Sequence, residues 1–178
     1  MTEKIIIAGS GGQGIMLLGK VLAYAAMEEN KFVTWLPAYG AEVRGGAAHC
    51  TVIISSKEIG SPCAAKADTM IIMNQPSFMK FKGRLESKGL FILNSSLVKP
   101  GREKNVRAIS FPFTDIAVDL GNVKVANMVA LGAFVAEKKT VGIKSIFAAM
   151  ERIAPAGSKG LIEINQQALL KGAGLING

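Results

Sequence analysis

The amino-acid sequence predicts an α/β fold in which helices flank a mostly parallel sheet. A β-branched run at residues 4–8 meets a cluster of glycines and is followed by the apolar pattern of a helix. More short apolar runs of strand type precede Asp115, and from there onward the periodicity is mainly helical. With a length of 178 residues, these observations predict one Rossmann-like domain over residues 1–178 that has a helical C-terminal part.

Each predicted element follows from its own residue pattern. Short apolar runs predict strands at residues 4–8, 32–36, 50–55, 69–74, 90–94 and 106–111. Periodic apolar positions predict helices at residues 13–29, 123–137, 143–153 and 161–175. Pro76 is placed to start another helix. The helix over 123–137 is apolar on nearly all sides, which predicts that it is deeply buried.

The chain is basic, with 21 lysines and arginines against 13 acidic residues and a net charge of +8. A nucleic-acid-binding module is one interpretation of that charge. However, aromatic residues make up only 6% of the chain and do not alternate with a basic stripe, so we do not expect a nucleic-acid partner. The densest basic stretch, residues 80–107, is expected to face an acidic partner, a phosphorylated ligand or water.

Nothing in the sequence predicts export or membrane insertion. No apolar run reaches the roughly 18 residues that a bilayer crossing needs. The apolar run after Met1 is too short for a signal peptide. We therefore expect a cytoplasmic protein with no membrane partner.

Cys50, Cys63 and His49 are the chain's two cysteines and one histidine. Iron–sulfur clusters typically take about four thiolates, and these residues lack the spacing of a zinc site. Adjacent residues on a strand point to opposite faces, so His49 and Cys50 cannot form a nucleophile–base pair. The sequence predicts no catalytic residue and no metal ligand here, and it predicts that both cysteines are small buried hydrophobic residues.

The glycine cluster after the first strand is a candidate anion-binding loop. The segment "GSGGQG" contains Gly9, Gly11, Gly12, Gln13 and Gly14, and it fits the pattern G-x-G-x-x-G. Glycines at such a turn allow backbone amides to approach a phosphate at the start of the following helix. A tight strand-to-helix turn also needs glycine for purely conformational reasons, so the pattern alone leaves both interpretations open.

Neither common nucleotide-binding fingerprint is complete. The second predicted strand ends in Trp35-Leu36-Pro37, with no carboxylate to hold a ribose. The residues after Gly14 are Ile15 and Met16, whereas a phosphate-binding P-loop has Lys followed by Ser or Thr. A stand-alone NAD- or FAD-binding protein is therefore the alternative, and we do not favour it.

A second glycine-rich loop, "AYGAEVRGG", spans residues 38–46. Arg44, followed by Gly45 and Gly46, can bind a carboxylate or phosphate with its planar guanidinium. Glu42 can hold that arginine or pair with a partner chain, and Tyr39 suits an interface or a lid. An exposed loop with an internal ion pair is the alternative interpretation.

Asn127 is a polar residue on the otherwise apolar helix predicted over 123–137. A buried amide side chain needs a hydrogen-bond partner. We favour a structural role with a buried partner, and a contact to substrate or a partner subunit is the alternative.

The two loops together resemble a known family. "GSGGQG", then "PAYGAEVRGGAAHC", then "GNVKVANMVALGA" at residues 121–133 resemble the gamma subunit of 2-oxoacid:ferredoxin oxidoreductases over nearly the whole chain. Ser61-Pro62, Asp68 and Asn74 also match, whereas Ala38 and Val43 replace the family's usual serine and methionine. The short chain most resembles the 2-oxoglutarate type, with the pyruvate and ketoisovalerate types as alternatives.

The resemblance implies a subunit of an oxidoreductase that is not active alone. Such enzymes convert a 2-oxoacid, coenzyme A and oxidised ferredoxin to acyl-CoA, CO2 and reduced ferredoxin. It implies that thiamine diphosphate, Mg²⁺ and iron–sulfur clusters lie on alpha, beta and, in some enzymes, delta partner subunits, and that ferredoxin is reached through the complex. For this chain it implies a structural role. The glycine loop, Gln13 and Arg44 are expected either to hold phosphates of coenzyme A or to clasp the catalytic subunits.

Overall fold

Six strands form one sheet in the computed structural model of the chain, which describes residues 1–38, 47–99, 101, 106–155 and 157–177. The strands are β1 Thr2–Ser10, β2 Phe32–Ala38, β3 Ala47–Ser55, β4 Ala67–Ile72, β5 Leu85–Asn94 and β6 Arg107–Phe111. Their order across the sheet is β2-β3-β1-β4-β5-β6. The prediction of a mostly parallel sheet is confirmed, since β1, β4, β5 and β6 run parallel. β3 is the exception and pairs antiparallel with both β1 and β2.

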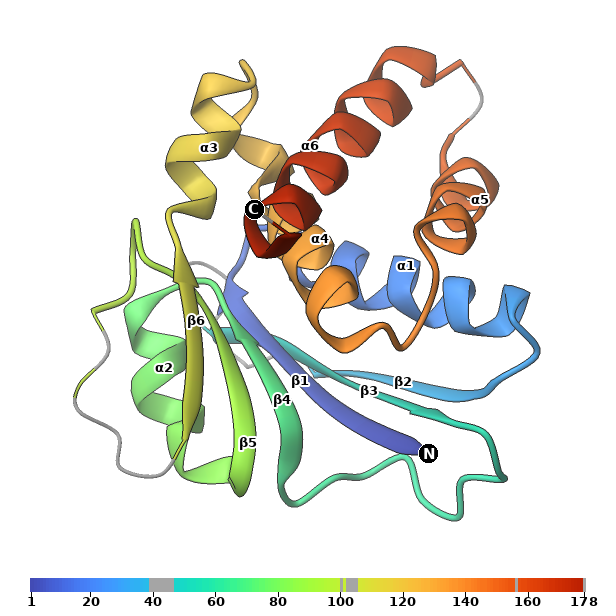
Figure 1. The fold of residues 1–178 in the computed structure, drawn as a ribbon, viewed down its shortest axis with the longest axis vertical. Coiled ribbons are helices and arrows are strands. Elements are labelled where there is room, and N and C mark those ends of the chain that lie inside the picture. The colour runs from blue at the N-terminus through green and yellow to red at the C-terminus, as the bar shows by residue number, and fades with distance from the viewer. Residues whose placement is uncertain (39–46, 100, 102–105, 156, 178) are drawn as a thin grey trace.

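Helices cover the two faces of the sheet unequally (Figure 1). The helices are α1 Ile15–Glu28, α2 Gln75–Phe81, α3 Phe113–Asp119, α4 Ala126–Lys138, α5 Ile143–Ile153 and α6 Lys159–Asn177, with short 3-10 helices η1 Lys82–Arg84 and η2 Val123–Val125. The larger core joins α1, α3, α4, α5 and α6 to the sheet face that carries Ile5 and Ile7. A smaller core joins α2 to the opposite face through Ile6 and Ala8. The alternation of apolar side chains along β1 therefore supplies both cores.

The predicted helix over 123–137 needs a correction. Residues 123–125 form η2, and the α-helix begins only at Ala126. Asn122 accepts a hydrogen bond from the Lys124 amide, which favours a tight first turn, and Val123 remains 53% exposed. The rest of the prediction is confirmed, because α4 is buried from Ala126 to Val135.

Two glycines allow α4 and α6 to cross closely. A Cβ at Gly132 would collide with the carbonyl oxygen of Leu169, and a Cβ at Gly172 would collide with the carbonyl oxygen of Val129. The two helix backbones are therefore in direct contact at the crossing. This contact keeps α4 enclosed between α6 and the sheet. No helix in the described part of the chain has the length and apolar character that a bilayer crossing requires.

Glu29 joins the end of α1 to the start of α5. Its carboxylate accepts a hydrogen bond of 2.6 Å from the Gly142 amide and pairs with Lys31 at 2.8 Å. Burial alone would raise the pKa of Glu29, but hydrogen bonds from Gly142, Lys31 and Ser145 outweigh it and lower the pKa from its usual value. The ionised carboxylate therefore stabilises the fold.

Replacing Glu29 with glutamine is expected to lower the free energy of unfolding by about 1 kcal/mol at pH 7. The pKa of Glu29 is lower in the folded protein than in the unfolded one. The carboxylate therefore contributes its full stabilisation at pH values above the unfolded-state pKa, and this stabilisation is lost as the pH falls through the folded-state pKa. Urea unfolding of the wild type and of Glu29→Gln should show a smaller difference in the free energy of unfolding at about pH 3 than at pH 7. Glu28→Gln, which breaks the exposed pair with Arg152, is the control and should change stability by less than about 0.5 kcal/mol. An equal loss for Glu29→Gln at both pH values would contradict the assignment.

Candidate functional site

The glycine loop lies where β1 ends, at the carboxyl edge of the parallel strands, and the Gln13 side chain fixes its shape. Gln13 Oε1 accepts a hydrogen bond of 2.8 Å from the Ser10 amide. Gln13 Nε2 donates to the Met73 carbonyl, just beyond β4, at 3.2 Å. The Gln13 side chain therefore ties the loop to the end of the neighbouring strand.

Gly9 and Gly14 are closely enclosed by neighbouring side chains. A Cβ at Gly9 would lie 2.6 Å from Gln13 Oε1 and 2.7 Å from Ile15 Cδ1. Gly14, the residue before α1, has a φ of +69°, and a Cβ there would collide with Asn127 Nδ2. Around Gly11 and Gly12, in contrast, a Cβ would meet nothing within 4 Å, and glycine is favoured at Gly12 only by its φ of +89°. The middle of the loop is therefore open to a ligand or another chain.

Asn127 closes the loop from the side of α4. It is 1% exposed, and its Nδ2 donates a hydrogen bond of 3.0 Å to the Gly14 carbonyl. Its Oδ1 accepts from the Met128 amide at 2.9 Å. The predicted buried partner of Asn127 is therefore Gly14, which lies 113 positions earlier in the chain.

Asn94 joins the end of β5 to two other segments at this edge, and the sequence analysis did not identify it. Its Nδ2 donates to the Met73 carbonyl at 3.2 Å and to Thr114 Oγ1 at 2.8 Å, and its Oδ1 accepts from the Thr114 amide. Asn94 is fully buried at the end of β5. A polar residue that ends an apolar strand was the available signal, since buried amides need partners.

A small pocket of about 150 Å³ opens at the same edge. It is lined by residues of the glycine loop, the segments after β4 and β5, α3, η2 and the start of α4: Gly12, Gln13, Met73, Leu97, Thr114, Val123, Lys124 and Ala126. Leu97 and Val123 are 46% and 53% exposed, so the rim of the pocket is apolar. Among the described residues that line it, Lys124 has the only charged side chain.

The second predicted loop lies outside the described residues. Tyr39, Glu42, Arg44, Gly45 and Gly46 all belong to it. The described residues on either side of it pair near the end of β1: Ala38 is opposite His49, which is opposite Ala8. The chain therefore leaves and re-enters the sheet beside the glycine loop.

His49 and Cys50 lie on opposite faces of β3, as predicted. Cys50 is buried against α1, and burial raises the pKa of its thiol to about 12. The His49 ring lies 4.6 Å from the Phe81 ring on the α2 side. Burial, and then the charges of Lys80 and Arg84, lower the pKa of His49.

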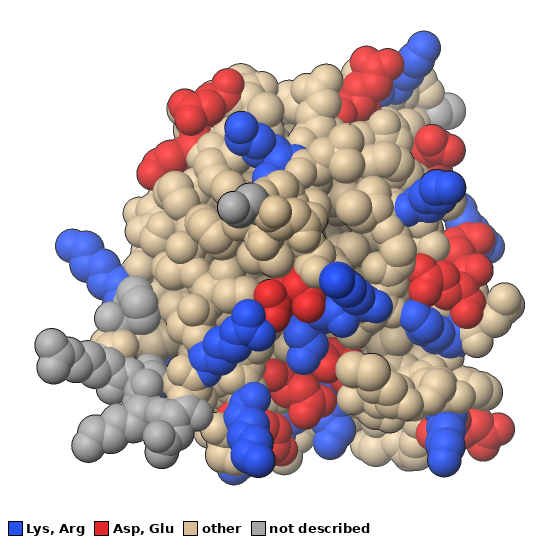
Figure 2. Space-filling view, viewed as in Figure 1, with Lys and Arg blue, Asp and Glu red and all other residues tan. Residues whose placement is uncertain are grey.

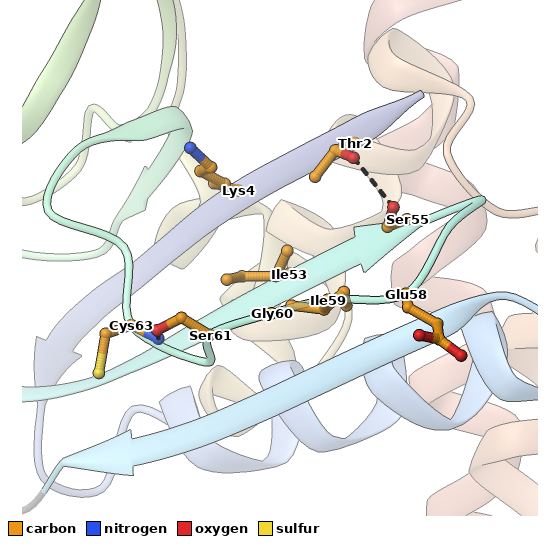
Figure 3. A pocket seen from close by; sticks show the side chains of 9 residues that line it. All are labelled: Thr2, Lys4, Ile53, Ser55, Glu58, Ile59, Gly60, Ser61 and Cys63. Carbon is orange, nitrogen blue, oxygen red and sulfur yellow. Dashed lines mark hydrogen bonds between the residues drawn. The ribbon is translucent and has the colours of Figure 1, made fainter.

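The prediction that Cys63 is buried is wrong. Cys63 is exposed at the rim of a second pocket, of about 290 Å³, near the start of β1 and the end of β3 (Figure 3). Lys4 and Cys63 lie toward one end of this pocket and Glu58 toward the other, while Thr2 and Ser55 bond each other at 2.9 Å. The loop over residues 56–63 places Cys63 away from the core. The sequence did not indicate this, because the neighbours Pro62 and Ala64 are apolar.

Thiol labelling should distinguish the two cysteines. With iodoacetamide at about pH 8, the folded protein is expected to take up one label, at Cys63, because a thiol as buried as Cys50 is almost never ionised at that pH. Unfolding in urea should expose the second thiol. Mass spectrometry of intact protein and of tryptic peptides gives both counts. Rapid labelling of a folded Cys63→Ser variant would show that Cys50 is accessible.

The basic stretch is partly bound to groups of its own chain. Arg107 pairs with Glu137 at 2.5 Å, and Arg84 donates to the carbonyls of Ala64 and Ala65. Lys80 lies over the Phe81 ring, 5.6 Å from its centre. Figure 2 shows acidic and basic side chains interspersed on one face of the molecule. Among the described residues of that face, the basic side chains do not form one continuous stripe.

Comparisons with known proteins agree on one family. The family model described as pyruvate ferredoxin/flavodoxin oxidoreductase matches residues 4–175. The ketoisovalerate oxidoreductase subunit VorA of Methanothermobacter marburgensis is 35% identical over 170 residues, which cover 96% of this chain. The chain spans only 36% of the length of that relative.

Shorter proteins match over most of their length. The 2-oxoglutarate synthase subunit KorC of Methanocaldococcus jannaschii is 34% identical, with 97% of this chain and 92% of KorC covered. The crystal structure of the gamma subunit of a keto/oxoacid ferredoxin oxidoreductase from Geobacter sulfurreducens is 29% identical, with a TM-score of 0.85 and 98% of both chains covered.

Proposed function

The chain belongs to the pyruvate ferredoxin/flavodoxin oxidoreductase family, and from this premise we propose that it is the gamma subunit of a multi-subunit 2-oxoacid:ferredoxin oxidoreductase. The observation that carries the proposal is the family match from residue 4 to residue 175. The complex would convert a 2-oxoacid, coenzyme A and oxidised ferredoxin to acyl-CoA, CO2 and reduced ferredoxin. The 34% identity with KorC over nearly the full length of both chains favours a subunit of the 2-oxoglutarate type.

Within that complex, the role of this chain is structural. Thiamine diphosphate with Mg²⁺ supplies the carbanion chemistry, and iron–sulfur clusters carry the electrons, both on the alpha and beta subunits or a delta subunit. Cys50 is buried on one side of β3 and Cys63 is exposed on a loop, so the two thiols cannot share one cluster. The NAD- or FAD-binding alternative has no support, because β2 ends in Leu-Pro-Ala without a carboxylate.

The glycine loop fits a phosphate of coenzyme A. Gly11 and Gly12 leave open space above the backbone, and the first turn of α1 has neither a side-chain cap nor an acidic residue. Gly9, Gly14 and Asn127 set the conformation of the loop. Gln13 bonds Ser10 and Met73 and so would position the amides, while Arg44 would supply the positive charge.

Purification of the tagged chain from its native source tests the proposal as a whole. We expect thiamine- and iron–sulfur-bearing subunits to co-purify, with ferredoxin reduction that depends on a 2-oxoacid. A chain recovered alone in a buffer that preserves complexes would overturn the proposal.

The Arg44→Ala variant of the assembled enzyme tests coenzyme A binding. Loss of a charged contact to phosphate should raise KM for coenzyme A about tenfold or more, with kcat little changed. Arg152→Ala, at an exposed ion pair on α5, is the control and should leave KM unchanged. An unaltered KM in Arg44→Ala would leave the loop with an interface role only.

A further inference from the structure

We propose that the 150 Å³ pocket at the carboxyl edge is a socket for one apolar side chain of a partner subunit, and that a neighbouring carboxylate of the same partner segment pairs with Lys124. The inference rests on the proposed function and adds the chemistry of the contact. The partner segment would carry a large apolar residue, such as Phe or Leu, beside Asp or Glu.

The size and lining of the pocket suit an apolar group. A cavity of about 150 Å³ lined by apolar side chains can hold a benzene ring. Met73 and Ala126 are buried in the pocket wall, and Leu97 and Val123 form an exposed rim. Covering that rim with another chain would remove apolar surface from water, which favours association.

The polar side chains of the lining are already bonded within the chain. Gln13 uses its amide on Ser10 and Met73. Thr114 Oγ1 accepts a hydrogen bond from Asn94. A polar ligand placed here would have to compete with these bonds, whereas an apolar side chain leaves them intact.

Lys124 is the exception, because its side chain is not bonded within the described chain, and it indicates that the partner carries a negative charge here. It is exposed, and no other described residue forms an ion pair or hydrogen bond with its ammonium group. The Lys124 amide donates a hydrogen bond of 3.0 Å to Asn122 Oδ1. This bond fixes the turn from which the lysine side chain extends beside Val123. The chain as a whole carries a net charge of +8. A carboxylate at the edge of the socket would pair with Lys124 and be attracted by this net charge.

Two variants test the socket in the complete complex. Ala126→Leu fills the pocket from its own wall, and because leucine is nearly as good a helix former as alanine, the variant should fold with a Tm close to that of the wild type. Lys124→Glu reverses the charge at an exposed position. Each is expected to reduce the partner subunits recovered with the tagged chain at least tenfold. Lys144→Glu, the same charge reversal at the start of α5, is the control and should retain them.

The outcomes separate this inference from the proposed function. If the wild-type chain recovers no partner subunit, the proposed function itself fails. If the wild type and both variants recover their partners equally, the socket is wrong while the function stands. Should Ala126→Leu fail to fold, Lys124→Glu and a photo-crosslinker in place of Leu97 decide the matter. The crosslinked partner peptide should contain an acidic residue beside the crosslinked apolar one, and a peptide without one would contradict the proposal.

Discussion

Replacing Gly172 with alanine is expected to lower the free energy of unfolding by about 3 kcal/mol, at the upper end of overpacking effects. The added methyl group would collide with the carbonyl oxygen and carbonyl carbon of Val129 in α4. These are backbone atoms, so no side chain can rotate to make room. Either α6 must move away from α4, or both helices must bend, and Ala168, Leu169 and Ala173 would lose their packing.

Urea unfolding followed by circular dichroism measures this loss. Gly132→Ala should behave similarly, because its methyl group would meet the Leu169 carbonyl from the other side of the same crossing. Gly174→Ala is the matched control, since a Cβ at this exposed α6 position meets nothing within 4 Å. It should stabilise the helix by about 0.5–1 kcal/mol. Equal effects at Gly172 and Gly174 would show that helix propensity, and not the close crossing, decides the outcome.

Alanine at Gly14 is the second substitution for which we expect a large effect, about 3 kcal/mol of destabilisation. Two causes combine there. The φ of +69° is unfavourable for a residue with a Cβ, by about 1 kcal/mol or more. The methyl group also collides with Asn127 Nδ2, and Asn127 cannot retreat because it is buried and bonded to the Gly14 carbonyl.

A double-mutant cycle with Asn127→Ala separates these causes. Asn127→Ala alone should cost about 2 kcal/mol, since it removes one of the two hydrogen bonds to the Gly14 carbonyl, the other coming from the Leu18 amide, and empties the space of a buried side chain. The double variant removes the collision and should lose about 3 kcal/mol, less than the sum of about 5 kcal/mol for the single variants. Free energies of unfolding for the four proteins give the coupling. Strictly additive losses would mean that Gly14 and Asn127 do not touch.

Most of the elements could be predicted from the sequence because they depend on local patterns. The β-branched run at 4–8 became the centre of β1, and the helix expected at 143–153 is α5. Pro76 occupies the first turn of α2, where its missing amide costs nothing. The direction of β3 was not predictable, because alternation of side chains is the same in parallel and antiparallel strands. The start of α4 was misjudged because apolar residues continue through η2.

The candidate site was predicted only in part. The glycine loop was evident from its spacing, and the need of Asn127 for a buried partner followed from its place on an apolar helix. The sequence did not reveal that this partner is Gly14, and it did not reveal the role of Asn94. Tyr39, Glu42, Arg44, Gly45 and Gly46 remain predictions, because they lie outside the described residues.

The sequence by itself determined the α/β class, the glycine loop and the family resemblance, since each depends on patterns of residues that are close together along the chain. Only the tertiary structure decided which distant groups meet at the carboxyl edge. Gln13 reaches Met73, Asn94 reaches Thr114, and Lys124 stands beside a pocket whose wall includes Gly12. The physical reason is that these contacts depend on strand order and helix crossing, which result from packing of the whole core rather than from any local pattern.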